Sequence, residues 1–218
     1  MPATAVPQDP APITATRVTF GEPRGEWPLM TVPPVAALLP VKRFEEAKAR
    51  LAPALDGAAR AALAREMAEK VVEACSGLST SVVCDDDDVA RWAAALGLAV
   101  IWTPGVGLNG AVARGVEHLA GRGAARVIVA HADLAHLLPG DLDPFVEGEG
   151  VQLAPDRHED GTNIAAVPPQ AGFTWAYGPG SFGRHCSEAK RCGQPLFVVR
   201  GERLAWDVDT PADLSPIA

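Results

Sequence analysis

The chain has 218 residues, and its 19 basic and 27 acidic side chains give a formal net charge of −8. That length suits one domain with appendages, large enough to bury a core without disulfides or structural metal. The composition, 48% hydrophobic and 21% charged, excludes wholesale disorder. An isoelectric point near 5.1 argues against nucleic-acid binding, because a phosphate backbone requires a cationic face. No apolar run approaches the roughly 20 residues of a membrane-spanning helix.

The first part of the chain differs in composition from the rest. Residues 1–33 are rich in Pro, Thr and small side chains, without helical or strand periodicity. They predict a flexible N-terminal extension, in which the stretch 27–30 is the candidate for a short docked piece. The folded domain is expected over residues 34–218.

Cysteine usage and the absence of a signal-peptide pattern predict a cytoplasmic protein. The four cysteines form no CxxC pair, so we expect reduced and mostly buried thiols. A zinc site or a catalytic thiol are the alternatives. The cysteines are Cys75, Cys84, Cys186 and Cys192.

Along the chain, short apolar runs typical of buried strands alternate with amphipathic segments typical of helices. Expected strands cover residues 35–41, 81–84, 98–102, 125–130, 151–155, 163–167 and 195–199, with 204–209 also extended. Expected helices cover residues 56–75, 87–96, 109–120 and 181–192. This order predicts an α/β fold with a mostly parallel sheet, helices on both faces, and an antiparallel or mixed edge from the last third. Ligands of such sheets bind beyond the carboxyl ends of the strands.

Two expected strands are followed by segments that suit phosphate binding. Four cations, which follow the first strand, could neutralise a polyphosphate or belong to a solvated basic helix face. They are Lys42, Arg43, Lys48 and Arg50. The glycine-rich residues 103–110 follow the third strand, where glycines let backbone amides approach an anion. An ordinary strand-to-helix turn is the alternative.

Carboxylates after two other expected strands suggest a metal site. Asp133 follows the fourth strand, where it could bind a metal or cap a turn. His131 is a second possible ligand, although such a histidine more often bonds to nearby backbone. Asp207 and Asp209, at positions i and i+2 of an extended segment, should point to one side while Val208 packs behind them. Two adjacent carboxylates repel unless a cation lies between them, which favours a divalent metal.

Further polar groups have two interpretations each. The acidic run 85–88 is the rival metal site, but it fits a solvated helix start better. Thr162 closes a polar turn and could bind a phosphate. Ser181 follows Gly178-Pro-Gly and suits a helix N-cap or an anion site equally. Residues 210–213 read as a second capped helix start.

Six segments in order resemble the 2-phospho-L-lactate guanylyltransferase family of coenzyme F-420 biosynthesis, whose bacterial members are often described as phosphoenolpyruvate guanylyltransferases. The segments are LLPVKRFEEAKARL, GVGLNGAV, VIVAHADL, LAPDRHEDGTNIAAV, YGPGSFGRHCSEA and LAWDVDTPADL. They run from Val35 to Leu214. Ala49 and Ala135 depart from the Ser and Pro expected there, and neither change removes a charge.

The resemblance implies a Rossmann-like nucleotidyltransferase fold of the GT-A type, a three-layer α/β sandwich. It implies a reaction of GTP with a phosphorylated three-carbon acid, which releases pyrophosphate, and metal ligands at Asp133, Asp207 and Asp209 for Mg²⁺. Substrate-phosphate contacts fall on Thr162, Gly178 and Ser181. Nucleotide contacts are expected at Lys42, Lys48, Arg50, Gly107, Leu108 and Asn109, with Lys42 also catalytic.

Phosphoenolpyruvate is the favoured acid, with 2-phospho-L-lactate or a phosphoglycerate as alternatives that differ by one or two atoms. The next enzyme of the pathway is a candidate partner. A sugar-phosphate or molybdopterin-type nucleotidyltransferase is a less favoured interpretation, because LLPVKRF lacks the glycine-rich LxGGxGxR loop of those enzymes. A non-catalytic nucleotide-binding module is another.

Overall fold

The computed structural model describes residues 34–214. The expectations for residues 1–33 lie outside the described residues. The strands are Val35–Pro40 (β1), Ser79–Cys84 (β2), Ala99–Trp102 (β3), Arg126–Ala130 (β4), Val151–Pro155 (β5), Thr162–Val167 (β6) and Leu196–Val198 (β7). The α-helices are Gly57–Ala74 (α1), Asp87–Ala95 (α2), Gly107–Gly121 (α3), Asp143–Glu147 (α4), Ser181–Arg191 (α5) and Glu202–Ala205 (α6). Short 3₁₀ turns cover Phe44–Glu46 (η1), Ala49–Leu51 (η2), Pro169–Ala171 (η3) and Pro211–Leu214 (η4).

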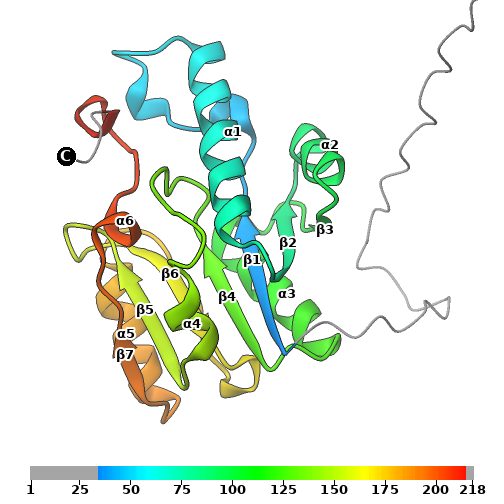
Figure 1. The fold of residues 1–218 in the computed structure, drawn as a ribbon, viewed down its shortest axis with the longest axis vertical. Helices are drawn as coiled ribbons and strands as arrows, with labels where there is room; N and C mark the ends of the chain where they lie inside the picture. Colours follow the sequence, from blue (N-terminus) through cyan, green and yellow to red (C-terminus); the bar gives the residue numbers. More distant parts are fainter. Residues whose placement is uncertain (1–33, 215–218) are drawn as a thin grey trace, which may run out of the picture.

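The seven strands form one sheet in the order β3-β2-β1-β4-β6-β5-β7 (Figure 1). β6 is antiparallel to both β4 and β5, while the other pairings are parallel. The mostly parallel sheet is therefore confirmed. The antiparallel strand, however, lies inside the sheet and not at an edge, so β6 begins where its neighbours end.

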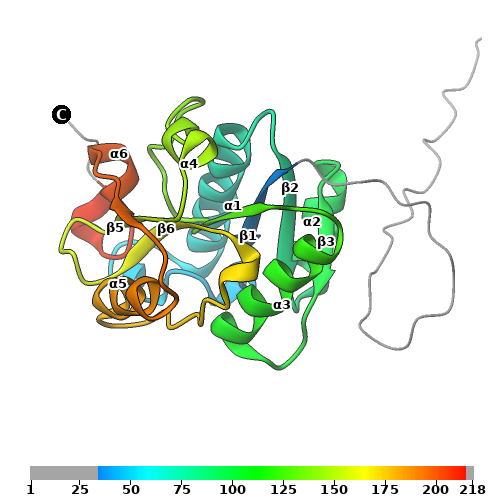
Figure 2. The same ribbon diagram turned by 90° about the horizontal axis from the view of Figure 1, so that it is seen from below.

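Helices cover both faces of the sheet and make three layers, as expected (Figure 2). Buried side chains of α1, α2 and α4 share one hydrophobic cluster with the sheet. Those of α3 and α5 share the cluster on the opposite face. β4, β5 and β6 are buried along their whole length, which explains why their sequences read as continuous apolar runs.

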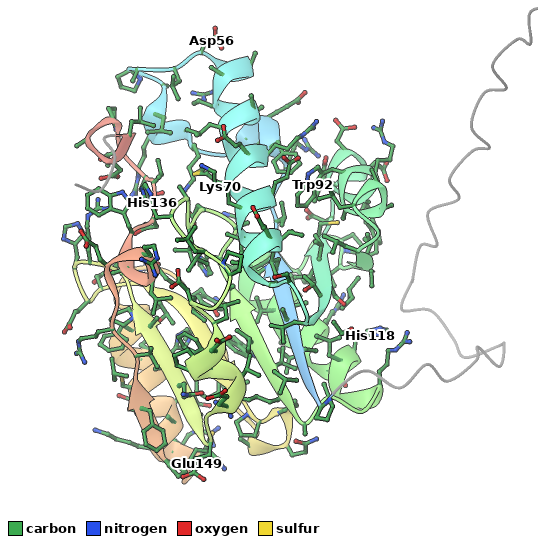
Figure 3. The ribbon with its side chains drawn as sticks, viewed as in Figure 1. Asp56, Lys70, Trp92, His118, His136 and Glu149 are labelled. Atoms are coloured by element: carbon green, nitrogen blue, oxygen red, sulfur yellow. The ribbon has the colours of Figure 1, made fainter. Side chains whose placement is uncertain are left out.

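Local signals account for the starts of two helices. Asp56, labelled at the N-terminal end of α1 in Figure 3, accepts a hydrogen bond from the Ala59 N–H at 2.8 Å. Asp86 caps α2 by accepting from the N–H groups of Asp88 and Val89, both at 3.1 Å. The acidic run 85–88 is thus a helix start. Trp92 of α2 lies toward α1 in the same figure, and its Nε1–H donates to Glu69 at 3.1 Å.

Three local expectations need correction. Residues 204–209 are not extended throughout, because Leu204 and Ala205 complete α6; the buried Leu204 holds this short helix on the core. Helix α4 was not expected, because at five residues it is too short to show helical periodicity; it begins with Asp143 followed by a proline. Helix α3 begins at Gly107, two residues before the expected start.

Candidate active site

The candidate site lies at the carboxyl ends of β1 to β4, the upper edge of the sheet in Figure 1. Three stretches of chain meet there. The first follows β1, the second follows β4, and the third follows α6; hydrogen bonds from Lys48 join the three at Asp133 and Asp209. This is the edge at which ligands of such sheets bind.

Asp133, Asp207 and Asp209 form a carboxylate cluster. One carboxylate oxygen from each lies within 4.8 Å of the others. Val208, between the two C-terminal aspartates, is buried against Leu51 and Met67. The predicted alternation is therefore present: the valine packs inward and both acids turn toward Asp133.

The backbone that carries Asp207 and Asp209 is fixed from two directions. Asp213 Oδ2 accepts from the N–H of Asp209 at 3.0 Å and from the N–H of Thr210 at 2.6 Å. Arg157 forms an ion pair with Asp213 and donates to the carbonyl of Asp207 at 3.2 Å. Its guanidinium also lies 4.8 Å from the centre of the Trp206 ring. Residues 205–213 are thus held in place before any ligand binds.

Lys48 lies inside the carboxylate cluster. Its Nζ is 2.5 Å from Asp133 Oδ2 and 3.2 Å from Asp209 Oδ1. Its backbone has φ 55° and ψ 38°, a left-handed conformation that non-glycine residues rarely adopt. This conformation joins η1 to η2 and turns the ammonium inward. Arg50 adds an exposed contact to Asp209 Oδ2 at 3.0 Å.

The pKa values of Asp133 and Asp207 are shifted in opposite directions. Burial alone would raise the pKa of Asp133, but the charge of Lys48 outweighs it and holds that pKa below its usual value. Burial, and then the charge of Asp133, raises the pKa of Asp207. Among the described side chains, Asp133 Oδ1 is buried without a hydrogen-bond partner. The cluster therefore retains both unneutralised charge and an unpaired oxygen, the properties of a cation site.

A glycine-rich turn over residues 177–180 lies at the same edge of the sheet as the cluster. Gly178 has φ +118° and Gly180 has φ +70°, conformations that favour glycine. Gly180, not Ser181, occupies the N-cap position of α5, and no side chain caps that helix end. The N-cap prediction for Ser181 is wrong because the left-handed glycine moves the serine to the first helical position. Ser181 is 1% exposed, and its N–H donates to the Gly178 carbonyl at 3.0 Å.

Arg184 orients this turn. Its guanidinium donates to the carbonyls of Ala176 and Gly178 at 2.8 and 3.3 Å, and to that of Pro179 at 2.5 Å. No hydrogen bond joins the Gly178 N–H to another residue within 34–214. Arg184 thus binds three carbonyls of this turn, while the Gly178 amide stays available to an anion.

The predicted nucleotide contacts divide into two groups. Lys48 and Arg50 reach the carboxylate cluster, whereas Lys42 is exposed on the segment that follows β1. Gly107 and Leu108 open α3. Asn109 is bound to the glycine-rich turn: its Oδ1 accepts from the Tyr177 N–H at 2.6 Å, and its Nδ2 donates to the Tyr177 carbonyl at 3.4 Å. The start of α3 is thereby linked to the turn that leads to Gly178.

His131, the residue that follows β4, lies next to Tyr177. Its ring centre is 4.8 Å from that of Tyr177, and its Nε2 is buried without a partner among the described residues. Its backbone N–H donates to the Asn163 carbonyl at 3.0 Å, which aligns the end of β4 with the start of β6. Figure 3 labels His118 and His136 on α3 and near α6, far apart from one another.

The four cysteines are free, as expected. Burial raises the pKa of Cys75 to about 12 and that of Cys84 to about 11. Thiols this hard to ionise are poor nucleophiles and poor metal ligands. Neither alternative is supported for these two cysteines.

Comparison with known proteins identifies the family. The family model described as "Guanylyl transferase CofC like" matches residues 35–218. The chain belongs to this family. The phosphoenolpyruvate guanylyltransferase of Sphaerobacter thermophilus is 37% identical to this chain, and the alignment covers 84% of this chain and 91% of that protein.

CofC-like relatives with other names are also similar. The 2-phospho-L-lactate guanylyltransferase of Methanothermobacter thermautotrophicus is 31% identical, over 83% of this chain and 82% of that protein. The 3-phospho-D-glycerate guanylyltransferase of Phenylobacterium zucineum is 32% identical, over 84% of this chain and 88% of that protein. The chain is thus a nucleotidyltransferase, and the names of its relatives differ in the acid.

The nucleotidyltransferase fold is shown by structural similarity as well. A CMP:2-keto-3-deoxy-manno-octonic acid synthetase, solved with CTP, superimposes with a TM-score of 0.55 at 15% identity. The match covers 83% of this chain and 95% of that one. The expected Rossmann-like sandwich is therefore confirmed.

Several site residues of this CofC-like chain escaped the sequence analysis. Arg157 and Asp213 hold the carboxylate-bearing segment, and Arg184 orients the glycine-rich turn. His185 reaches Thr162 from α5. A signal for His185 did exist, because Ser181 and His185 are four residues apart and share one face of the helix. Asp213 also had a local signal, because it belongs to the capped helix start at residues 210–213 and accepts from the Thr210 N–H. No spacing rule could have found Arg157 or Arg184, whose partners are distant in sequence or are backbone carbonyls.

Proposed function

We propose that this protein joins GTP to phosphoenolpyruvate, giving enolpyruvoyl-2-diphospho-5′-guanosine and pyrophosphate, as a step of coenzyme F-420 biosynthesis. One observation carries the proposal. The carboxylate cluster and the glycine-rich turn lie at the same edge of the sheet, which supports a cation site and an anion site that share one reaction volume. The names of the curated relatives supply the guanylyl group and the acid.

The reaction needs no general base from the protein. A phosphate oxygen of the acid, ionised at neutral pH, attacks the α-phosphorus of GTP and forms a new P–O bond. The bond from that phosphorus to the bridging oxygen of the β-phosphate breaks, and pyrophosphate leaves with its electron pair. Since anion approaches anion, the protein contributes positioning and positive charge.

Each group of residues then has one task. Thr162, Gly178 and Ser181 bind the anionic groups of the acid. Lys42, Lys48 and Arg50 neutralise the nucleotide phosphates, and Lys42 acts on the reacting phosphate. Residues Gly107, Leu108 and Asn109 contact the guanosine. For Asn109 this task competes with its hydrogen bonds to Tyr177.

The carboxylate cluster fits Mg²⁺, because the three acids supply oxygen ligands of the kind this ion prefers and Asp133 Oδ1 is unpaired. Asp133, Asp207 and Asp209 would hold the ion, which supplies charge neutralisation for the phosphoryl oxygens. Lys48 and Arg50 must then give up part of their contacts with Asp209.

An assay with three acids tests the proposal. Purified protein with Mg²⁺ is incubated with phosphoenolpyruvate, 2-phospho-L-lactate or 3-phospho-D-glycerate, and with GTP or ATP. Pyrophosphate release and the mass of the product are measured. We expect the highest kcat/KM with phosphoenolpyruvate and GTP. Preference for another acid would reassign the substrate, and no turnover with any pair would favour a non-catalytic nucleotide-binding module.

A sugar-phosphate nucleotidyltransferase is the second candidate within the fold. The segment after β1 argues against it, because two 3₁₀ turns and the inward-pointing Lys48 stand where those enzymes have a glycine-rich loop. Sugar 1-phosphates in the same assay provide the test.

We further propose a cytoplasmic location, a catalytic domain over residues 34–218 and the next enzyme of the pathway as a partner. Within residues 34–214, no helix combines the length and the apolarity that a bilayer crossing requires. Reduced thiols and a GTP substrate suit the cytoplasm.

A further inference from the structure

His185 is a fully buried side chain on α5, one helical turn beyond Ser181. Aromatic rings enclose its imidazole: the centres of the Phe173, Trp175 and Tyr177 rings lie 5.5, 6.0 and 4.9 Å from its own. A ring packed in this way has one orientation, so the direction of each ring nitrogen is fixed.

The hydrogen bonds of His185 determine which nitrogen carries the proton. Nε2 accepts from the Ala176 N–H at 3.0 Å and is therefore unprotonated. Burial lowers the pKa of His185 to about 4, so the ring is neutral at physiological pH. The single ring proton must then lie on Nδ1.

Nδ1 lies 3.0 Å from Thr162 Oγ1. Since Nδ1 carries the proton, the Thr162 hydroxyl must accept this hydrogen bond. A hydroxyl has one proton and two acceptor lone pairs, so its own proton is directed elsewhere. Thr162 thus remains a donor for a group other than His185.

We infer that His185 is a positioning residue for the acid substrate: it fixes the Thr162 hydroxyl as a donor to the anionic group of that substrate. The same ring holds Ala176, two residues before Gly178, so both sides of the anion site are set by one imidazole. The inference rests on the proposed function, in which Thr162 contacts the acid.

Two substitutions test the roles of the two ring nitrogens of His185 separately. The amide of His185→Asn is as many bonds from Cα as Nδ1 and can donate to Thr162. The amide of His185→Gln is as many bonds from Cα as Nε2 and can accept from Ala176, but it leaves Thr162 without a donor. We expect His185→Gln to raise the KM for phosphoenolpyruvate about tenfold, since hydrogen bonds to charged groups are worth this much. The KM for GTP should change less than twofold.

His185→Asn should restore the KM for phosphoenolpyruvate to within about threefold of wild type. His118→Gln, on α3 and away from the candidate site (Figure 3), is the matched control and should alter neither KM. A rise in both KM values for His185→Gln, or an equal loss in His185→Asn, would overturn the inference and leave only a structural role.

A double-mutant cycle tests the route through the hydroxyl. Thr162→Val removes the hydroxyl and should raise the KM for phosphoenolpyruvate. In that background His185→Gln should add less than a twofold change, and a full additive effect would overturn the inference. An unchanged KM in an active Thr162→Val enzyme would instead contradict the proposed role of Thr162 itself.

A measurement on the wild-type protein keeps the inference testable if the variants do not fold. Nitrogen-15 NMR of the full chain distinguishes the two imidazole tautomers. We expect His185 to be protonated on Nδ1 at pH 7. Protonation on Nε2 would overturn the inference whatever the enzyme assays show.

Discussion

Lys48 reaches Asp133 across 85 positions of the sequence, with Nζ 2.5 Å from Oδ2. The pair is largely buried: the lysine side chain is 9% exposed and the aspartate side chain 25%. This contact ties the segment after β1 to the segment after β4, and it gives the carboxylate cluster a resident cation.

Replacement of Lys48 by Met should destabilise the protein when Mg²⁺ is absent, because it leaves Asp133 buried and unpaired. Loss of one partner of a buried pair costs about 3 kcal/mol. Added Mg²⁺ should recover part of this loss by taking over the charge. Thermal unfolding with EDTA and with Mg²⁺ measures both effects. Arg50→Met, which removes a cation that is 76% exposed, is the control and should cost less than about 1 kcal/mol.

Asp207→Asn and Asp209→Asn should respond differently when Mg²⁺ is absent. Burial, and then repulsion by Asp133, raises the pKa of Asp207, so Asp207→Asn should be at least as stable as wild type in EDTA. Asp209→Asn should be less stable, because Asp209 accepts from Lys48 and Arg50. With Mg²⁺ both should lose most of their turnover. Near-normal pyrophosphate release in both would contradict the metal assignment.

Asn109→Ala should raise the KM for phosphoenolpyruvate more than the KM for GTP. The amide oxygen and the amide nitrogen of this side chain both hydrogen-bond to the backbone of Tyr177, the residue before Gly178. We expect about a tenfold rise for the acid, equivalent to one or two lost hydrogen bonds. Asn109→Asp keeps the acceptor for the Tyr177 N–H and should lose less. A larger effect on GTP would show that Asn109 mainly contacts the guanosine.

His185 should make the stability of the protein depend on pH. Its pKa is lowered from 6.5 to about 4, so the unfolded chain takes up a proton at a higher pH than the native state does. Stability is therefore full above pH 6.5 and falls as the pH decreases toward 4, by about 2 kcal/mol between pH 7 and 5. Denaturant unfolding at these two pH values should show a smaller difference for His185→Asn than for wild type.

Deletion of residues 2–30 should leave kcat/KM within a few-fold of wild type. The deleted sequence lacks periodicity, carries none of the six family segments and ends before β1. Activity and thermal unfolding of the shortened chain provide the measurement. A loss of activity beyond tenfold would show that this part of the chain supports the domain.

Apolar runs were enough to predict the strands, because residues such as those of β4 are buried on both faces. They could not predict the direction of β6: a strand buried along its whole length reads the same whichever way it runs. Its direction follows from the chain before it, which returns through a short polar loop from β5.

The carboxylate cluster was predictable for a similar local reason. Asp207 and Asp209 alternate with a buried valine, a period of two that is visible in the sequence. The place of Lys48 was not predictable, because it depends on one left-handed residue between two 3₁₀ turns. Of the two interpretations of Ser181, the N-cap is wrong because Gly180 and Ser181 are both acceptable N-caps, and only the φ of Gly180 decides between them.

The carboxylate cluster combines Asp133, from within the sheet-forming sequence, with two residues that follow that sequence. The last strand, β7, ends at Val198, and Asp207 and Asp209 follow it in the chain. During synthesis on the ribosome every strand therefore emerges before two of the three carboxylates. A chain that stopped after β7 would contain all seven strands and Thr162, yet would lack two of the three proposed metal ligands. The proposed guanylyl transfer would thus become possible only when translation has passed residue 209.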